Sequence, residues 1–264
     1  VMEDQSVDAY KPAKIAELVE NIGVSKAVMP TVPTIMLGLM AGAFIAFGAM
    51  FYTLVMTNHD MGLGPARLLG GIAFSLGLIL VVVGGAELFT GNNFIVMAWA
   101  ENKVTTLQLL RNWSIVYIAN FVGAVGTAIL MFWSGALALG DNAFADNAVD
   151  IAAYKTSLSP IQAFVRGILC NALVCLSVWL CFAARDVASK ILAIIFPVSA
   201  FVALGFEHCI ANMYFIPLGM LLSDGQIGVS EFLTNIIPVT AGNIVGGSIF
   251  VAFVYWVVYV RKYE

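Results

Sequence analysis

The sequence predicts an all-α membrane protein whose six transmembrane spans form two inverted three-helix repeats with two broken helices. Three observations predict this fold class: long apolar stretches, a polar break inside two of them, and motifs that recur at a constant offset. Hydrophobic residues make up 61% of the 264 residues and charged residues only 11%, whereas a soluble domain carries about 25% charged residues. The bilayer is therefore expected to surround most of the chain. The net charge of -4 and the lack of a basic run in the sequence argue against a nucleic-acid partner.

Six stretches of the chain are long and apolar enough to cross a bilayer, which takes about 20 residues of helix. They are residues 31–56, 68–100, 107–137, 159–183, 191–222 and 232–260. Polar loops are expected to separate them, and the longest of these loops is expected at 140–157.

Residues 1–28 are predicted to form a cytoplasmic segment with an amphipathic helix at 12–27 that lies along the membrane surface. Residues 29–261 are predicted to form a single transmembrane channel domain. Its two repeats are expected at about 31–137 and 159–260.

An even number of spans places both termini on one side of the membrane, and the distribution of Lys and Arg indicates which side. With cytoplasmic termini, the inner segments hold nine of these residues and the outer segments three. The outer three are Arg67, Lys155 and Arg166. This asymmetry predicts that both termini are cytoplasmic.

Two of the six stretches contain a polar break with a Glu deep inside an apolar segment. An ionisable group at that depth costs from about 3 to more than 10 kcal/mol, so it usually has a function. Glycines and polar residues around each Glu indicate a broken helix whose freed backbone groups line a cavity or are buried in protein. The breaks share the pattern Gly-x-Glu-x-x-x-x-Asn-x-aromatic at an offset of 120 positions: Gly85, Glu87, Asn92 and Phe94, then Gly205, Glu207, Asn212 and Tyr214.

The helix that follows each break also repeats. The strings NFVGA from Asn120 and NIVGG from Asn243 coincide at an offset of 123 positions. An odd number of spans in each half forces the two copies to insert with opposite orientations. Inverted repeats whose broken helices meet near the middle of the bilayer are typical of a transport pathway.

The two broken helices are expected to face each other, with Leu88 and Thr90 of one break near Glu207 and His208 of the other. Apolar residues precede each break: Phe74, Leu78 and Phe201. A narrow apolar passage with one polar spot should admit small solutes and resist hydrated ions, because a wide aqueous channel is lined with many polar groups.

His208 is the residue on which this interpretation depends most. A lone buried histidine usually has a structural role, but His208 lies in a helix break beside Glu207, which favours a role in the pore. Glutamate occurs in both halves, so Glu87 and Glu207 are expected to anchor the breaks, together with Asn92 and Asn212.

Four cysteines lie in apolar stretches and form no CxxC motif, which predicts buried thiols: Cys170, Cys175, Cys181 and Cys209. We expect no metal and no other cofactor. An intramembrane enzyme would need a nucleophile with a base or a metal set. Cys209 and His208 are the one candidate pair, but neighbours at a helix break point in different directions. The protein is therefore expected not to be an enzyme.

The strings AELFTGNN, GFEHCIANMYFIP and PVTAGNIVGG resemble those of the formate–nitrite transporter family, over nearly the whole chain. Within that family the chain is most similar to bacterial formate channels. The resemblance implies a channel or transporter for formate and related small monovalent anions, gated by pH or linked to protons. Nitrite or hydrosulfide stays an alternative, because members that carry them share these motifs. A pore for neutral small solutes is a weaker alternative, because the aquaporin NPA signature is absent from the sequence.

The resemblance also implies an aquaporin-like protomer fold, a homopentamer with one pore per protomer, and a location in the bacterial inner membrane. It implies that Leu78 and Phe201 form the central constriction and that Thr90 hydrogen-bonds His208. The other residues it implies along the substrate pathway are Phe74, Leu88, Val174, Asn171 and Lys155.

Overall fold

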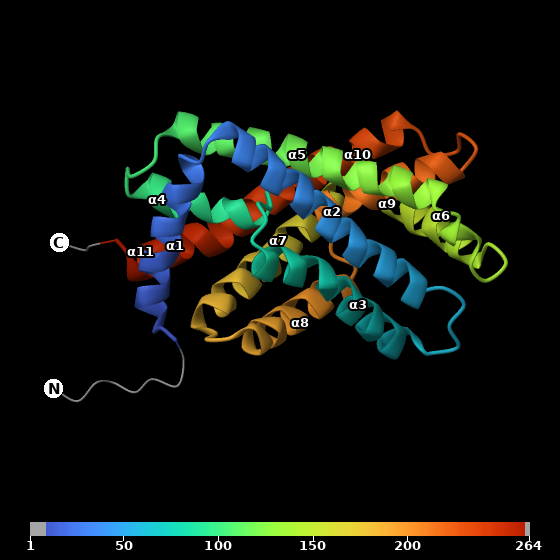
Figure 1. Cartoon of the computed structure of the whole chain (residues 1–264), viewed down its shortest axis with the longest axis horizontal. Helices are drawn as coiled ribbons and strands as arrows, with labels where there is room; N and C mark the ends of the chain where they lie inside the picture. The colour runs from blue at the N-terminus through green and yellow to red at the C-terminus, as the bar shows by residue number, and fades with distance from the viewer. Residues whose placement is uncertain (1–8, 262–264) are drawn as a thin grey trace.

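The computed structural model describes residues 9–261, and this part of the chain folds into helices joined by short loops, with no strand (Figure 1). The helices are α1 (Pro12–Ala27), α2 (Thr31–Val55), α3 (Leu63–Gly84), the 3₁₀ helix η1 (Gly91–Phe94), α4 (Ile95–Ala100), α5 (Thr106–Trp133), the 3₁₀ helix η2 (Ala136–Ala138), α6 (Ala143–Thr156), α7 (Pro160–Ala183), α8 (Val187–Ala203), α9 (Cys209–Leu222), α10 (Val229–Ile244), the π-helix η3 (Val245–Phe253) and α11 (Val254–Tyr259).

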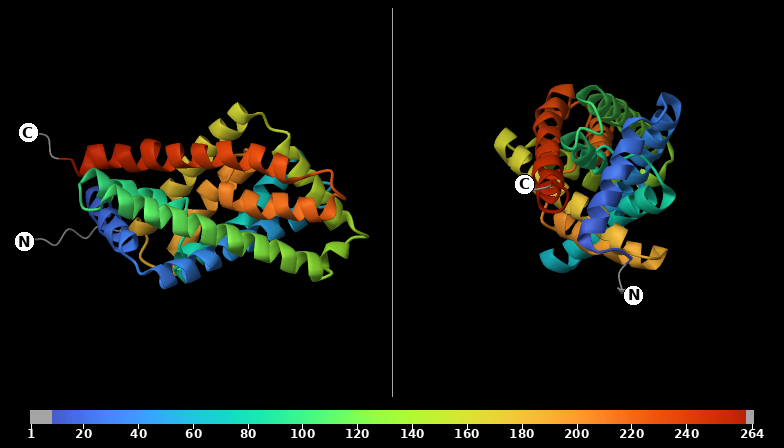
Figure 2. Two further views of the ribbon diagram at one scale, coloured as in Figure 1. Left: turned by 90° about the horizontal axis from the view of Figure 1, so that it is seen from above. Right: turned by 90° about the vertical axis from the view of Figure 1, so that its left-hand side faces the viewer.

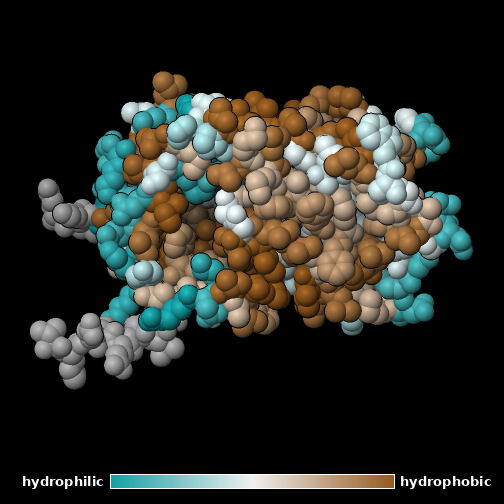
Figure 3. Space-filling model, in the orientation of Figure 1, coloured by the Kyte–Doolittle hydropathy of each residue, from teal (hydrophilic) through white to brown (hydrophobic). Residues whose placement is uncertain are grey.

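Five apolar helices among the described residues are long enough to cross a membrane: α2, α3, α5, α7 and the continuous helix from α10 through η3 to α11. Two further apolar helices, α8 and α9, are shorter. Figure 3 shows apolar side chains in a broad band across the middle of one face, with polar side chains gathered at its two ends. The helices α1 and α11 lie at one of these ends and α6 at the other (Figure 1). These features are those of a helical membrane protein.

Both helix breaks lie where the sequence predicts them. The helix α3 ends at Gly84, and Gly85 follows with a φ of 78°, a left-handed conformation that favours glycine. The helix α8 ends at Ala203, Gly205 follows with a φ of 71°, and α9 begins only at Cys209. Each of the two predicted stretches is therefore divided into separate helices by a loop that contains a left-handed glycine.

The prediction of a polar loop at 140–157 is wrong, because the chain folds there into α6, a helix of 14 residues. Its buried residues, Phe144, Ala148 and Ala152, recur at every fourth position, and α6 packs on α9. This spacing gathers three apolar side chains on one helical face, and their burial outweighs the aspartates on the other face. The helix contributes to the site, because it carries Lys155 to Glu207 in the second break.

The helix predicted at 12–27 is confirmed as α1. Ile15 and Val19 are buried, and α1 packs on α4 closely enough that a Cβ at Gly23 would lie 3.4 Å from Ile95 Cα. Ile22 of the same helix is exposed. The helix is thus held by the protein itself, and its placement in the cytoplasm stays a prediction.

Two helix pairs approach so closely that backbone meets backbone. A Cβ atom added at Gly123 of α5 would lie 2.1 Å from Leu39 O of α2. A Cβ atom added at Gly246 of η3 would lie 2.1 Å from Ile168 O of α7. Figure 2 shows α5 and the helix from α10 to α11 running along the long axis of the molecule. Small residues at these two motif positions let the helices pack at this distance.

Replacing Gly123 with alanine should destabilise the fold, because the added methyl group would overlap Leu39 O. Overpacking of this kind costs about 1–3 kcal/mol. Gly126→Ala in the same helix is the matched control, since a Cβ there meets nothing within 4 Å. Thermal unfolding in detergent should show a lower midpoint for Gly123→Ala than for the wild type or the control. Equal midpoints for the two variants would contradict the close approach.

Candidate functional site

Two cavities enter the molecule from its opposite ends. The first, which we call the α6-side cavity, has a volume of about 240 Å³ and is lined by residues of α2, α3, α6, α8, α9 and the loop before α9. The second, which we call the α1-side cavity, has a volume of about 370 Å³ and is lined by residues of α1, α3, α7, η1 and the loop before η1. The candidate site is the region in which these cavities approach each other.

Four apolar side chains occupy the space between the two cavities. Phe74 and Phe201 line the α6-side cavity, and their rings meet edge to face with centroids 5.8 Å apart. Leu78 and Leu88 line the α1-side cavity. Each of the four is only 3% exposed. A solute that moves from one cavity to the other must therefore pass between apolar groups.

His208 lies beside this constriction, and its two ring nitrogens have different partners. Its Nδ1 accepts a hydrogen bond from the backbone N–H of Ala211 at 3.2 Å and so caps the start of α9. Its Nε2 lies 3.0 Å from Thr90 Oγ1, and its ring stacks on Phe201 with centroids 6.2 Å apart. Because Nδ1 accepts, the neutral ring carries its proton on Nε2 and donates it to Thr90. The pair joins the two helix breaks and places a proton donor beside the constriction.

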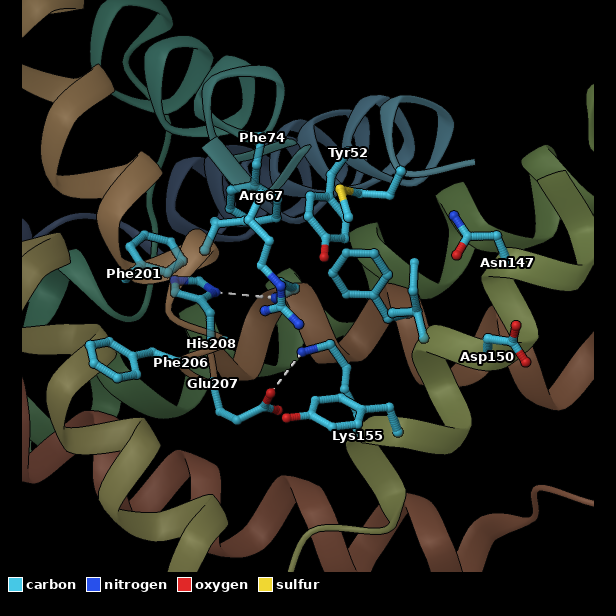
Figure 4. Close-up of a pocket in the computed structure, with 17 residues that line it drawn as sticks. Tyr52, Arg67, Phe74, Asn147, Asp150, Lys155, Phe201, Phe206, Glu207 and His208 are labelled. Atoms are coloured by element: carbon cyan, nitrogen blue, oxygen red, sulfur yellow. Dashed lines mark hydrogen bonds and ion pairs between the residues drawn. The ribbon is translucent and has the colours of Figure 1, made fainter. Parts of the chain in front are cut away.

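Glu207 holds the second break through both carboxylate oxygens. Its Oε1 accepts from Lys155 Nζ at 2.9 Å, an ion pair that Figure 4 marks, and its Oε2 accepts from Asn212 Nδ2 at 2.6 Å. Asn212 Nδ2 also donates to Asn235 Oδ1 at 2.8 Å, and Asn235 Nδ2 donates to Lys155 O at 2.8 Å. Glu207 is 1% exposed, so the protein itself supplies the partners that water would otherwise supply.

Glu87 holds the first break through partners of the same kinds. It accepts from Lys26 Nζ of α1 and, at 2.7 Å, from Asn92 Nδ2. Asn92 Nδ2 also donates to Asn112 Oδ1 at 2.9 Å, and Asn112 Nδ2 donates to Lys26 O at 3.0 Å. The contacts of both glutamates fit the structural role that the sequence predicts for them.

Two asparagines pair the backbone groups that the breaks leave free. Asn243 Nδ2 donates to Gly167 O at 2.8 Å and to Glu207 O at 2.9 Å. Its Oδ1 accepts from Cys209 N at 2.8 Å. Such an amide supplies hydrogen bonds that a continuous helix would otherwise make. Asn120 makes the matching three bonds in the first half, with Gly38 O at 2.7 Å, Glu87 O at 2.9 Å and Phe89 N at 2.9 Å.

The structure brings most of the predicted pathway residues together. Asn171 and Val174 are buried in α7 and line neither of the two cavities. Asn171 Nδ2 donates to Asn243 O at 2.7 Å and to Asn93 Oδ1 at 2.8 Å, so it connects α7 with α10 and η1. A place for these two residues along the pathway stays a prediction. The residues that do surround the constriction or line a cavity are Phe74, Leu78, Leu88, Thr90, Phe201, His208 and Lys155.

Two cations at the cavities are not singled out by the sequence motifs. Lys26 lines the α1-side cavity and Arg67 lines the α6-side cavity. The repeat could have pointed to Lys26. This residue precedes Lys155 by 129 positions, and the same offset separates Gly38 from Gly167. Arg67 belongs to none of the repeated motifs, and only the three-dimensional packing of α3 brings it to the site.

Known proteins share both the sequence and the fold of this chain. The family model for the formate/nitrite transporters matches residues 13–257. The formate channel FocA of Escherichia coli (strain K12) is 40% identical over 278 residues, which cover 98% of this chain and 98% of that protein. The probable formate transporter of Methanothermobacter thermautotrophicus is 40% identical over 268 residues, which cover 95% of this chain and 97% of that protein.

Two solved structures superpose on the chain. A pentameric formate channel with formate bound is 39% identical and has a TM-score of 0.81, covering 88% of this chain and 98% of its own. An ion channel of the FNT family is 26% identical and has a TM-score of 0.85, covering 92% of this chain and 98% of its own.

Replacing Asn243 with alanine should destabilise the protein strongly, because Gly167 O, Glu207 O and Cys209 N would lose this partner. Each buried polar group left unpaired costs about 1–3 kcal/mol. The thermal unfolding midpoint in detergent should fall well below that of the wild type. Asn21→Ala, at an exposed position of α1, is the matched control. If both variants unfolded at the same temperature, Asn243 would not anchor the break.

Proposed function

Because the chain belongs to the formate/nitrite transporter family, we propose that it is a channel for formate and related small monovalent anions. Relatives named as a formate channel and a probable formate transporter support formate as the substrate. The observation that carries the proposal is the short apolar constriction between two cavities, with the pair of His208 and Thr90 beside it.

The constriction explains how the channel would select its solute. A bare anion in an apolar passage faces a desolvation cost of tens of kcal/mol in the idealised limit. Phe201 and Leu78 exclude ions that keep their hydration shell, because neither side chain can replace that shell. The proton on His208 Nε2 offsets part of the desolvation cost for an anion small enough to reach it. Thr90 accepts this proton's hydrogen bond when no anion is present.

Two modes of transport follow from this arrangement. An anion that only accepts a hydrogen bond from His208 crosses as an anion, and the protein is then a passive channel. An anion that takes a proton from the imidazolium form of His208 leaves the neutral ring behind and crosses as the neutral acid, and transport is then linked to protons. Formate suits both modes, because a carboxylate accepts hydrogen bonds and also binds a proton.

We propose further that the fold consists of two inverted repeats of three spans in an aquaporin-like protomer. The first repeat comprises α2, α3 with α4, and α5, and the second comprises α7, α8 with α9, and the helix from α10 to α11. Equivalent residues that make equivalent contacts support this pairing: Lys26, Glu87, Asn92 and Asn112 match Lys155, Glu207, Asn212 and Asn235. The helices α1 and α6 then correspond as well, since each supplies the lysine of its half.

In the cell, we place residues 29–261 in the bilayer of the bacterial inner membrane as one channel domain, with residues 1–28 and both termini in the cytoplasm. The excess of Lys and Arg in the inner segments supports this orientation. The α1-side cavity then opens to the cytoplasm and the α6-side cavity to the outside. The solved relative described as pentameric supports a homopentamer with one pore per protomer.

Sealed proteoliposomes that contain the protein should pass formate much faster than protein-free liposomes, and faster than they pass glycerol. Nitrite and hydrosulfide measured in the same assay rank the alternative substrates within the family. Leu78→Trp is the blocking control, because a larger side chain would fill the buried space between the cavities. Glycerol flux equal to formate flux, or unchanged flux in Leu78→Trp, would contradict the proposal.

His208→Asn should flatten the pH profile of formate flux, because asparagine is polar like histidine but does not titrate. The charged groups that line the α6-side cavity with His208 all remain in this variant: Arg67, Asp150, Lys155 and Glu207. Flux in proteoliposomes at stepped pH measures the effect. An unchanged pH profile in a correctly assembled variant would rule His208 out as the titrating group.

A further inference from the structure

Arg67 extends from α3 into the α6-side cavity. In Figure 4 its guanidinium lies between the ring of His208 and the amine of Lys155. Its side chain is partly exposed, so a solute in the cavity can reach it. The position is one that an anion would occupy immediately before the apolar passage.

The charge of Arg67 has no carboxylate partner. Within residues 9–261, no carboxylate oxygen lies within the 4.0 Å that defines an ion pair with Arg67, whereas Lys155 is paired with Glu207 at 2.9 Å. Asp150 also lines the cavity, but it is exposed and lies across the cavity from Arg67 in Figure 4. Arg67 is therefore the cation that an anion in this cavity would meet without a competing partner.

Arg67 makes one structural contact, and this contact occupies only one of its N–H donors. Nη1 donates to Ala203 O at 3.3 Å, at the C-terminal end of α8, where a cation stabilises the helix dipole. A guanidinium has five N–H donors, and this is the one hydrogen bond that Arg67 makes to the described residues.

Arg166 provides the contrast. Its Nη1 donates to Tyr154 Oη at 2.7 Å and to Gly205 O at 3.3 Å, and its side chain does not line the cavity. Arg166, in α7, thus places the same charge near the C-terminal end of α8 but does not line the cavity.

We propose that Arg67 is the docking residue for a carboxylate anion in the α6-side cavity. The planar fork of N–H donors matches two carboxylate oxygens, which the point charge of a lysine does not. The apolar walls, which include Phe206 and Phe215, suit the carbon end of a monocarboxylate better than a multivalent anion. The cavity of about 240 Å³ has room for carboxylates larger than formate, and these dock and compete with it.

The proposal deepens the proposed function and rests on it for the identity of the transported anion, whereas binding at Arg67 does not require transport. The probe is trifluoroacetate, whose binding to the purified full-length protein in detergent is followed by ¹⁹F NMR line broadening. Arg67→Gln should raise its dissociation constant at least fivefold. Arg166→Gln, the matched loss of a positive charge close by, should raise it less, because Arg166 does not line the cavity. Formate should displace the probe, and neutral trifluoroethanol should show no saturable binding.

A dissociation constant in Arg67→Gln equal to that of the wild type would overturn the proposal, and so would an equal rise in Arg166→Gln. If Arg67→Gln does not assemble, Arg67→Lys decides the question, because it keeps the charge and a donor for Ala203 O but loses the planar fork. Its dissociation constant should rise at least twofold, and an unchanged value would overturn the proposal. Formate flux in the same wild-type preparation tests the proposed function separately. If formate crosses the membrane but the probe does not bind at Arg67, the docking proposal is wrong and the proposed function stands.

Discussion

Each backbone group that a helix break exposes inside a membrane must find a partner in the protein, because lipid offers none. Asn120 and Asn243 meet this constraint at the two breaks, each with two donated bonds and one accepted bond. Both asparagines belong to helices other than the broken ones, so each break is completed only when α5 or α10 packs against it. The separation of the two cavities depends on these contacts, because the breaks carry Leu88, Thr90 and His208 to the constriction.

The buried glutamates extend the same constraint to the ends of the molecule. A carboxylate that is 1% exposed, such as Glu207, needs a cation and several donors at close range. Lys155 supplies the cation and thereby fixes α6 to the second break, while Lys26 fixes α1 to the first. The two helices that flank the cavity entrances are therefore held by ion pairs that reach into the core. The charges of the two lysines are thereby neutralised, whereas Arg67 on the α6 side has no carboxylate partner among the described residues.

Much of the fold could be predicted from sequence because its main features interrupt an apolar background. Glycine, glutamate and asparagine inside a hydrophobic stretch mark the breaks, and their recurrence pairs the two halves. The helix α6 could not be predicted as easily, since its buried face is made of three apolar residues in a short helix that also carries two aspartates. At the site, the motifs locate Thr90 and His208, but the direction in which Arg67 points depends on how α3 packs on α8. Contacts of that kind join residues far apart in sequence and leave no local pattern.

The cap that His208 provides to α9 has a consequence for proton movement. A histidine conducts protons along a chain of groups when one ring nitrogen receives a proton while the other releases one. In this protein Nδ1 is committed to the N–H of Ala211, so a proton that arrived there would uncap the helix and meet a second donor. Only the Nε2–H is left to face an anion, and in the neutral ring it acts as a hydrogen-bond donor, because losing this proton would leave an imidazolate. In this geometry His208 therefore donates a hydrogen bond to a passing anion, but it does not conduct protons across the membrane.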